Sequence, residues 1–362
     1  MAIQRESNLE LFRVIVMLMI IAHHYIVNSG LIDEVLLYEP MSFKTFFSYL
    51  FGAYGKVGIN CFVLITGYFM CTSSISLRKY TKLVLQVLFY NTVLTLFFAI
   101  FYSKSISIGR FIYLLSPIKD VAQGFVSTFL LFYLLIPFLN LVITHLDKVK
   151  HFVLICYGLF IYSFIGTTPL PMSMNYVSWF CVLYFIASYL RIYPIEINKW
   201  SPVKFWGWAM FISLLLSILS IVFCMSLGKY IGKHMPYWFI SDSNKILALT
   251  TGVTAFMFFR HLKIRNSKII NILGGTTFGI LLIHANSAYM RHWLWKDLFN
   301  NVGNYTSDFF YMHAVGAVIL IFITCAIIDY LRLIIFEKPL FLWLDNIMCN
   351  SRLKKVWTEI KL

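Results

Sequence analysis

Charged residues are scarce in this sequence. Lys, Arg, Asp and Glu together make up 12% of the 362 residues, whereas globular chains average about 25%. Hydrophobic residues account for 60%, aromatic residues for 18%, and the mean hydropathy is +0.79. Such a composition excludes an ordinary soluble domain, because too little polar surface would be left to face water. It predicts an all-α fold, a polytopic membrane helix bundle.

Cysteines are also few, and segments that could divide the chain are absent. The seven cysteines stand singly, without a Cys-x-x-Cys pair and without a histidine at metal-ligand spacing. We therefore expect neither a disulfide nor a metal site. No linker rich in Pro, Gly or Ser and no repeat of fixed period occurs, which predicts one integral membrane domain over residues 1–338. A basic, amphipathic tail over residues 339–362 is expected to lie along the inner leaflet.

Long apolar runs recur along the whole chain. A bilayer core of about 30 Å requires about 20 apolar residues in a helix, and we predict about ten transmembrane helices. Their approximate ranges are 9–27, 57–71, 80–102, 121–144, 152–165, 176–193, 205–227, 244–259, 269–290 and 312–336.

Basic residues are unevenly distributed between the two sides of this predicted bundle. With the N-terminus inside, 20 of the 30 Lys and Arg residues fall on the inner side, as the positive-inside rule requires. The bias predicts that both termini are cytoplasmic. Because the basic residues are scattered over helix ends and do not gather on one face, the formal charge of +15 indicates no nucleic-acid partner.

Three connections on the predicted outer side are longer than a turn. They cover residues 28–56, 103–120 and 291–311, and loops of that length are usually functional. Two of them are rich in Tyr, Phe, Ser and Asn. These residue types suit a sugar-like or otherwise hydroxylated ligand.

The first apolar run contains Arg13 and His24, eleven residues apart. Eleven helical steps return to within roughly 20° of the start, so the two side chains share a face about 16 Å apart along the axis. Polar residues at membrane depth usually face a bundle interior or a wet cavity and are functional. Ser7 and Glu10 have the spacing of a capping box; alternatively, Glu10 pairs with Arg13 at i,i+3. His23 points about 100° away from His24.

The second apolar run carries small residues at Gly52, Gly55 and Gly58 and polar groups at Asn60 and Thr66. The glycines allow a helix or a ligand to approach the backbone closely.

A cationic cluster follows at the predicted cytoplasmic mouth, formed by Arg78, Lys79 and Lys82. It could be a positive-inside anchor, or it could bind the phosphates of a cytosolic cofactor. At the other end of the chain, Asp329 is predicted to pair with Arg332 at i,i+3.

Several motifs, taken in order, resemble the membrane-bound acyltransferase-3 family. They are the Arg-x10-His pair (Arg13, His24), the glycine-rich stretch from Gly55 to Tyr68, and the basic pair Lys79 and Lys82. The segments Leu131 to Asn140 and Gly274 to His284 also resemble family segments. The chain departs from the family pattern in having lysines where Arg-x-x-Arg is usual and Leu281 where Tyr is common.

This resemblance implies a bundle of about ten helices that moves an acyl group, usually acetyl from acetyl-CoA, onto a hydroxyl of an exported or surface glycan. The partners implied are an acyl-CoA, a glycan or other hydroxylated acceptor and the lipid bilayer. The abundance of Ile, Lys, Asn and Phe suggests a bacterial genome poor in G and C, and so a bacterial cell membrane.

The same assignment can be argued from chemistry. An alcohol is a weak nucleophile and needs a base, and histidine titrates near neutrality. We therefore expect His24, Arg13 and Glu10 to be the catalytic residues, with Arg13 holding either a phosphate or Glu10. Arg78, Lys79 and Lys82 are expected to bind the cofactor. Asn60 or a backbone N–H near Gly58 is a candidate oxyanion donor. The resemblance further implies that Tyr68 and His284, which lie in its motifs, contact substrate together with Asn60.

Two other functions fit the same residues. A transporter or flippase could use Arg13 and His24 as a gate or proton relay, although the inverted repeats common in transporters are not evident. A membrane glycan polymerase would usually require carboxylates or basic residues in its outer loops. The outer loops offer five carboxylates, which form no arrangement that indicates a site: Asp33, Glu34, Glu39, Asp297 and Asp308.

Overall fold

The fold is known from a computed structural model that describes residues 6–37, 39, 41–102, 109, 112, 116–118, 124–170, 174–197, 200–349 and 354–358. The chain is 80% helical, and the regular elements within the described residues are all helices. The predicted all-α, polytopic bundle is confirmed.

Within the described residues, seven helices are long and apolar enough to cross a membrane. They are α1 (Ser7–Val27), α2 with α3 (Phe43–Gly52 and Gly55–Met70), α4 (Leu77–Phe101), α6 (Phe125–Thr144), α7 with η2 (Lys148–Gly158 and Leu159–Ile165), α9 (Pro202–Ile231), and the run of α14, η4 and α15 (Phe310–Arg332, Leu333–Glu337 and Lys338–Cys349).

Three further predicted segments coincide with apolar helices of other kinds. The helices α8 (Tyr176–Ile192) and α10 (Ile246–His261) are apolar but shorter. The helix α11 (Lys268–His284) meets the following helical segment at an angle of 94°, so the two form a broken span or a re-entrant loop. Each of the ten predicted apolar ranges thus lies on a helix.

Two of the connections predicted as loops are helical. Residues 28–56 contain η1 (Ile32–Leu36) and α2, which begins where the Ser42 hydroxyl accepts a hydrogen bond from the Thr45 N–H at 3.0 Å. Residues 291–311 contain the end of α12 (Ala288–His292), η3 (Trp293–Leu298) and α13 (Asn301–Asn304). These connections are therefore short helices, and their suitability for a hydroxylated ligand stays a prediction. Most of residues 103–120 lie outside the described residues.

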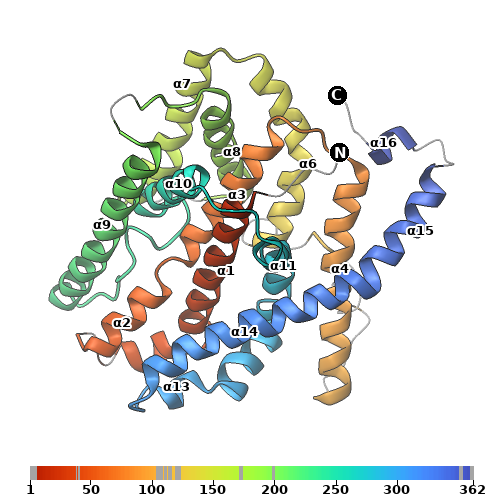
Figure 1. The fold of residues 1–362 in the computed structure, drawn as a ribbon. Helices are drawn as coiled ribbons and strands as arrows, with labels where there is room; N and C mark the ends of the chain where they lie inside the picture. Colours follow the sequence, from red (N-terminus) through yellow and green to blue (C-terminus); the bar gives the residue numbers. More distant parts are fainter. Residues whose placement is uncertain are drawn as a thin grey trace. The chain divides into compact units, whose positions relative to one another are not determined.

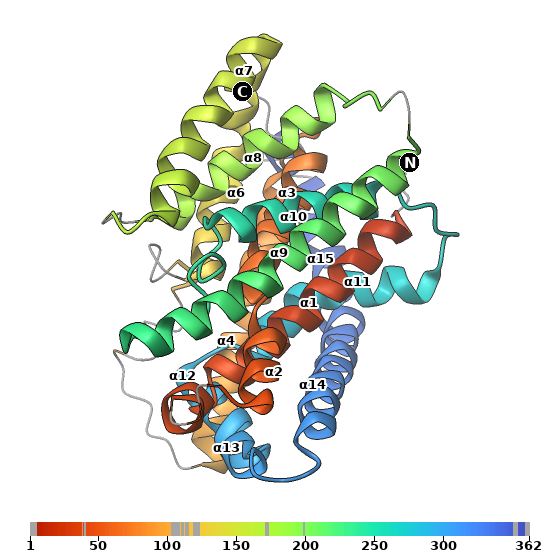
Figure 2. The ribbon, with the colours of Figure 1, turned by 90° about the vertical axis from the view of Figure 1, so that its left-hand side faces the viewer.

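The chain forms two compact units, each assembled from segments far apart in the sequence. Unit 1 comprises residues 1–65, 159–172 and 195–326, and unit 2 comprises residues 66–158, 173–194 and 327–362. In unit 1, α1 packs against α2, α10 and α11, and α9 lies alongside α10 (Figures 1 and 2). In unit 2, α8 packs against α6 and α7, and α16 (Lys354–Thr358) against α4. The predicted domain boundary at residue 338 stays a prediction, since helix runs on from Phe310 to Met348.

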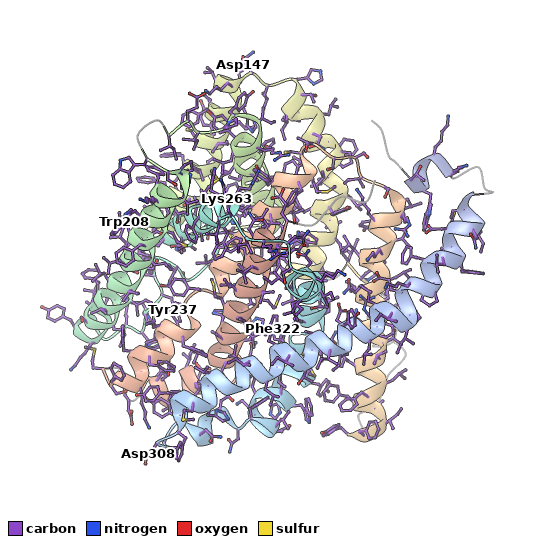
Figure 3. The ribbon with its side chains drawn as sticks, viewed as in Figure 1. Asp147, Trp208, Tyr237, Lys263, Asp308 and Phe322 are labelled. Carbon is purple, nitrogen blue, oxygen red and sulfur yellow. The ribbon has the colours of Figure 1, made fainter. Side chains whose placement is uncertain are left out.

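The outer face of α9 is apolar and uncovered within the described residues. Trp208 projects from it with 57% of its surface exposed (Figure 3), and Phe211, Leu215, Leu219 and Phe223 follow along one stripe at 43–58% exposure. A continuous apolar stripe of this length would be unfavourable in water. It is the face expected of a helix surrounded by lipid.

The small residues of the second apolar segment allow α1 to approach closely. A Cβ atom at Gly55 would overlap the side chain of His23, and one at Gly58 would lie 2.8 Å from Ile20 Cγ1. At Gly52 it would lie 3.0 Å from Ile26 Cβ. The predicted close approach is therefore confirmed, and its partner is the helix that carries Arg13 and His24.

Candidate active site

Polar side chains in the first turn of α1 form hydrogen bonds with two neighbouring helices, α10 and α11. Ser7 Oγ accepts from the backbone N–H of Ser267 at 2.9 Å and donates to Asn271 Oδ1 at 2.8 Å. Asn8 Nδ2 donates to the backbone carbonyl oxygen of Phe259 at 3.0 Å. The first bond satisfies the backbone N–H of Ser267, the N-cap of α11, and the Asn8 amide adds a second donor to a carbonyl oxygen at the end of α10 that also accepts from the Leu262 N–H. They set the register of α1 against α10 and α11.

Glu10 pairs with Arg13 and does not close a capping box. The Arg13 guanidinium lies 3.2 Å from Glu10 Oε1. The capping-box interpretation of Ser7 is wrong: Glu6 is the N-cap residue, without a side-chain cap, and the Ser7 hydroxyl is used by α11. Glu10 is 6% exposed and lies against Gly274, where any Cβ would overlap its carboxylate. The alternative pairing that the sequence offered is thus the one observed.

His24 contacts a second histidine from α11. Its Nδ1 lies 3.0 Å from Nε2 of His284, and the ring centroids are 5.1 Å apart. The Nδ1 of His284 lies 2.7 Å from the backbone carbonyl oxygen of Ile280. His284 is fully buried, whereas His24 is half-buried. The resemblance singled out His284, but nothing in the sequence indicated that it would contact His24.

His23 is engaged elsewhere. Its Nδ1 lies 2.6 Å from the backbone carbonyl oxygen of Gly52, so this nitrogen carries the proton and donates it. The two adjacent histidines therefore have different surroundings, as their angular separation on a helix requires. Of the pair, His24 is the one that meets another titratable ring at the α1–α11 contact.

Aromatic and amide groups close the far end of α1. Tyr25 Oη lies 2.8 Å from Nδ1 of His313, and the Tyr25 carbonyl oxygen accepts from Asn301 Nδ2 at 3.0 Å. The fully buried Trp295 packs edge to face on Tyr25 at 5.8 Å. The short helices between α11 and α14 thus cover the end of α1 at Tyr25, the residue that follows His24. The sequence showed these residues only as part of a polar and aromatic connection.

Asn60 joins α3 to the connection that precedes α10. It is fully buried, and its Nδ2 donates to the backbone carbonyl oxygen of Ser243 at 2.7 Å. One turn earlier, Lys56 lies 3.6 Å from Asp242. The carboxamide therefore has a structural partner, and its role as an oxyanion donor stays a prediction.

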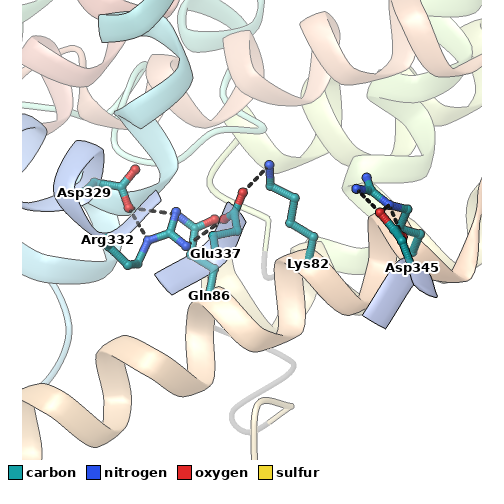
Figure 4. A network of polar contacts seen from close by, with 7 residues as sticks. Lys82, Gln86, Asp329, Arg332, Glu337 and Asp345 are labelled. Carbon is teal, nitrogen blue, oxygen red and sulfur yellow. Dashed lines mark hydrogen bonds and ion pairs between the residues drawn. The ribbon is translucent and has the colours of Figure 1, made fainter. Parts of the chain in front are cut away.

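The cationic cluster lies in unit 2, where two of its three members meet carboxylates. Arg78 binds Asp345 through two nitrogens at 2.8 and 2.9 Å, and Lys82 Nζ lies 2.5 Å from Glu337 Oε1 (Figure 4). Lys79 Nζ instead donates to the backbone carbonyl oxygen of Ser74 at 3.1 Å. The acidic partners come from the end of the chain. Because they are so distant in sequence, these ion pairs could not be predicted from it.

A buried polar network extends from this cluster (Figure 4). Asp329 is fully buried and accepts from Gln86 at 3.1 Å, from Tyr90 at 2.7 Å and from Arg332 at 2.8 Å. Arg332 also donates to Glu337 at 2.6 Å. The predicted pairing of Asp329 with Arg332 is confirmed. The network fixes the end of α14 to α4 within unit 2.

Tyr68 contacts a cation that the sequence analysis did not select. Its hydroxyl accepts from Arg191 at 3.0 Å, and the Arg191 guanidinium lies 4.7 Å from the centre of its ring. In the sequence, Arg191 was counted only as one of the 20 basic residues on the predicted inner side. Tyr68 therefore belongs with the basic residues of unit 2, whereas Asn60 and His284 belong to unit 1.

No group of three or more His, Cys, Asp or Glu side chains that could hold a metal occurs among the described residues. The candidate catalytic groups of α1 and α11 are thus two imidazoles and a guanidinium–carboxylate pair.

A multi-pass helical membrane protein with paired histidines on two packed helices is the class that the fold and the site define. Comparison with protein-family models matches the acyltransferase domain of the acyltransferase-3 family to residues 6–333. The chain belongs to this family and is a membrane acyltransferase. Comparisons with curated proteins and with solved structures found no significant match. Glu337 and Asp345 lie outside the matched range.

Proposed function

We propose that this membrane acyltransferase transfers an acetyl group from cytosolic acetyl-CoA to a hydroxyl of an exported or surface glycan in a bacterial cell membrane. The observation that carries the proposal is the histidine pair at the contact of α1 with α11, because it joins an imidazole of an apolar helix long enough to cross a membrane to a second, fully buried imidazole. The family match favours acyl transfer over the transporter and polymerase alternatives.

In this proposal His24 is the general base. It removes the proton from the acceptor hydroxyl while the oxygen attacks the thioester carbonyl carbon. The tetrahedral oxyanion then collapses, the carbon–sulfur bond breaks, and the departing thiolate takes the proton from the imidazolium. An oxyanion donor such as the Asn60 carboxamide would stabilise the negative oxygen. The residues of the chain need no metal for these steps.

Arg13 and Glu10 support the same helix face. Their ion pair lies in the first turns of α1, on the predicted inner side. The paired charges avoid the cost of a lone guanidinium within the bilayer. We assign Arg13 the role of orienting the donor, with Glu10 fixing the direction of its side chain.

The donor's phosphates are assigned to the N-terminal turn of α4. Ser76 is the N-cap of this helix, and Arg78, Lys79 and Lys82 project from its first turns. A helix N-terminus carries partial positive charge and favours an anion. Phosphates would there replace the carboxylates of Glu337 and Asp345 on Lys82 and Arg78. Tyr68 and Arg191 add a ring and a guanidinium in the same unit.

Replacing His24 by alanine tests the proposal. We expect the acetyl transfer rate to fall by about 10²–10⁴-fold, which is the usual contribution of a general base. The assay supplies membranes that contain the protein with radiolabelled acetyl-CoA and cell-surface glycan, and it measures label in the glycan and release of coenzyme A thiol.

The matched control is His23→Asn, whose amide can still donate to the Gly52 carbonyl oxygen. This variant should retain transfer. Undiminished transfer by His24→Ala, at equal amounts of inserted protein, would remove His24 from the role of base.

A further inference from the structure

His284 uses both of its ring nitrogens. The Nδ1 atom lies 2.7 Å from the Ile280 carbonyl oxygen, and the Nε2 atom lies 3.0 Å from Nδ1 of His24. The ring is fully buried between packed helices. Buried polar atoms are expected to have partners, and this arrangement satisfies both nitrogens without a carboxylate.

The first of these contacts determines where the proton of His284 resides. A carbonyl oxygen only accepts hydrogen bonds, so Nδ1 of His284 carries a hydrogen and donates it. A neutral imidazole has a single N–H, and an apolar bundle favours the neutral form because an unpaired charge would be costly there. Nε2 of His284 is then a lone-pair acceptor.

The second contact, between His284 and His24, determines which nitrogen of His24 carries the hydrogen. An acceptor at Nε2 of His284 requires a donor at Nδ1 of His24, 3.0 Å away. A neutral His24 with its hydrogen on Nδ1 has its lone pair on Nε2. The chain of bonds from the Ile280 carbonyl oxygen through His284 thus selects one of the two tautomers of His24.

We propose that His284 is a positioning residue that holds His24 in the tautomer whose Nε2 can take the acceptor's proton. The inference rests on the proposed role of His24 as the base. When Nε2 of His24 becomes protonated, its Nδ1–H still points at the lone pair of His284. That bond then becomes charge-assisted and stabilises the imidazolium. No proton moves along the pair.

The packing of the two helices supports this role. Ser7 and Glu10 fix α1 against α11 through Ser267 and Gly274, at the opposite end of the contact from the histidines. His284 is fully buried, whereas the residue His24 retains partial exposure. His24 is therefore the better placed of the two residues to meet a substrate.

A carboxylate often orients a catalytic histidine in soluble hydrolases. In this bundle an imidazole accepts the same hydrogen bond without adding a charge at membrane depth. The geometry therefore gives His284 a different role from the substrate contact that the family resemblance implied.

Two substitutions of similar size test the proposal. In His284→Gln the side-chain amide oxygen can accept from His24 Nδ1, whereas His284→Met fills the space without a comparable acceptor. We expect the methionine variant to lose at least 10²-fold in kcat with an unchanged KM for acetyl-CoA, and the glutamine variant to recover most of that loss. A histidine base held in the wrong tautomer is known to lose activity on this scale or more.

A spectroscopic measurement separates this inference from the proposed function. Nitrogen-15 spectra of histidine-labelled protein in lipid, assigned with His24→Ala, should show His24 protonated on Nδ1 in the unmodified chain and in His284→Gln. His284→Met should shift the population toward the Nε2-protonated form.

Three outcomes would overturn the role of His284. They are an Nε2-protonated His24 in the unmodified chain, full activity of His284→Met, and equal losses in both variants with a raised KM. Retained activity in His24→Ala would instead contradict the choice of base, while the spectra would still report the tautomer.

Discussion

In unit 2, the burial of an ion pair determines how much its loss would destabilise the fold. Asp329 and Arg332 are 1% and 4% exposed at their side chains, whereas Asp345 and Arg78 are 32% and 43% exposed. Removing one partner of a buried pair leaves an uncompensated charge, which is strongly destabilising. An exposed pair is screened by water and contributes little.

These two aspartates therefore predict different effects of the same substitution. Asp329→Asn should lower the free energy of unfolding by about 3 kcal/mol, since Arg332 and Lys82 would then share the single carboxylate of Glu337. Asp345→Asn should change it by no more than about 1 kcal/mol. Unfolding of the purified variants in mixed detergent micelles measures both values. Equal effects would show that the buried network does not fix α14 to α4.

Histidines 23 and 24 show how adjacent identical residues acquire different tasks. One ring donates to the backbone carbonyl oxygen of a glycine, and the other meets His284. Because neighbouring side chains on a helix point about 100° apart, His23 meets the carbonyl oxygen of Gly52 itself and His24 meets His284. The neighbours of each ring then determine its chemistry.

At the scale of elements, the contact of α1 with α11 and the first turn of α4 carry the two halves of the proposed reaction. The first supplies the base and its orienting partner. The second supplies cations next to backbone N–H groups, among them the Lys79 N–H that the Ser76 hydroxyl caps at 3.2 Å. The two carboxylates that neutralise Lys82 and Arg78 come from η4 and α15, beyond the range matched by the family.

The assignment of α4 to the donor leads to a prediction for Lys79. Lys79→Gln should raise the KM for acetyl-CoA by about tenfold, because a charge-assisted hydrogen bond to a phosphate contributes about 1.5–3 kcal/mol. The kcat should stay the same, since the proposed chemistry takes place at His24. Transfer kinetics at varied acetyl-CoA concentration give both constants.

The control for Lys79 is Lys150→Gln. Lys150 is another basic residue on the predicted inner side, and its side chain is 70% exposed. Its substitution should leave the KM unchanged. An equal rise in KM for both variants would indicate a general effect of surface charge and no phosphate site on α4.

At the scale of the whole molecule, the proposed reaction takes its two substrates from opposite sides of the membrane. The distribution of Lys and Arg predicts which connections are cytoplasmic. Lys263 lies between α10 and α11 on the predicted inner side, and Asp308 lies before α14 on the predicted outer side (Figure 3). Both are exposed.

Labelling of introduced cysteines tests this sidedness. A membrane-impermeant maleimide added to intact cells should label Asp308→Cys above the background of the parent chain, whereas Lys263→Cys should react only after the membrane is opened. The exposed Cys156 makes the parent chain a necessary comparison. Labelling of Lys263→Cys in intact cells would reverse the predicted orientation, and the donor would then have to enter from the other side.

The sequence by itself determined the features that depend on local pattern. Apolar runs located the helices, because each run reports the surroundings of its own segment. The spacing of Arg13 and His24 predicted one helix face, and the Arg13–Glu10 and Asp329–Arg332 pairs followed from helical periodicity. The order of short motifs indicated the family that the comparison then matched.

Only the tertiary structure decided which distant residues meet. His24 and His284 are 260 positions apart, and Lys82 and Glu337 are 255 apart, so no local periodicity connects them. The short helices in the predicted outer loops also depend on neighbours far along the chain. The same holds for Ser7, whose hydroxyl accepts a hydrogen bond from the start of α11. A hydrogen bond between side chains depends on how whole helices pack, and that packing is a property of all their contacts together.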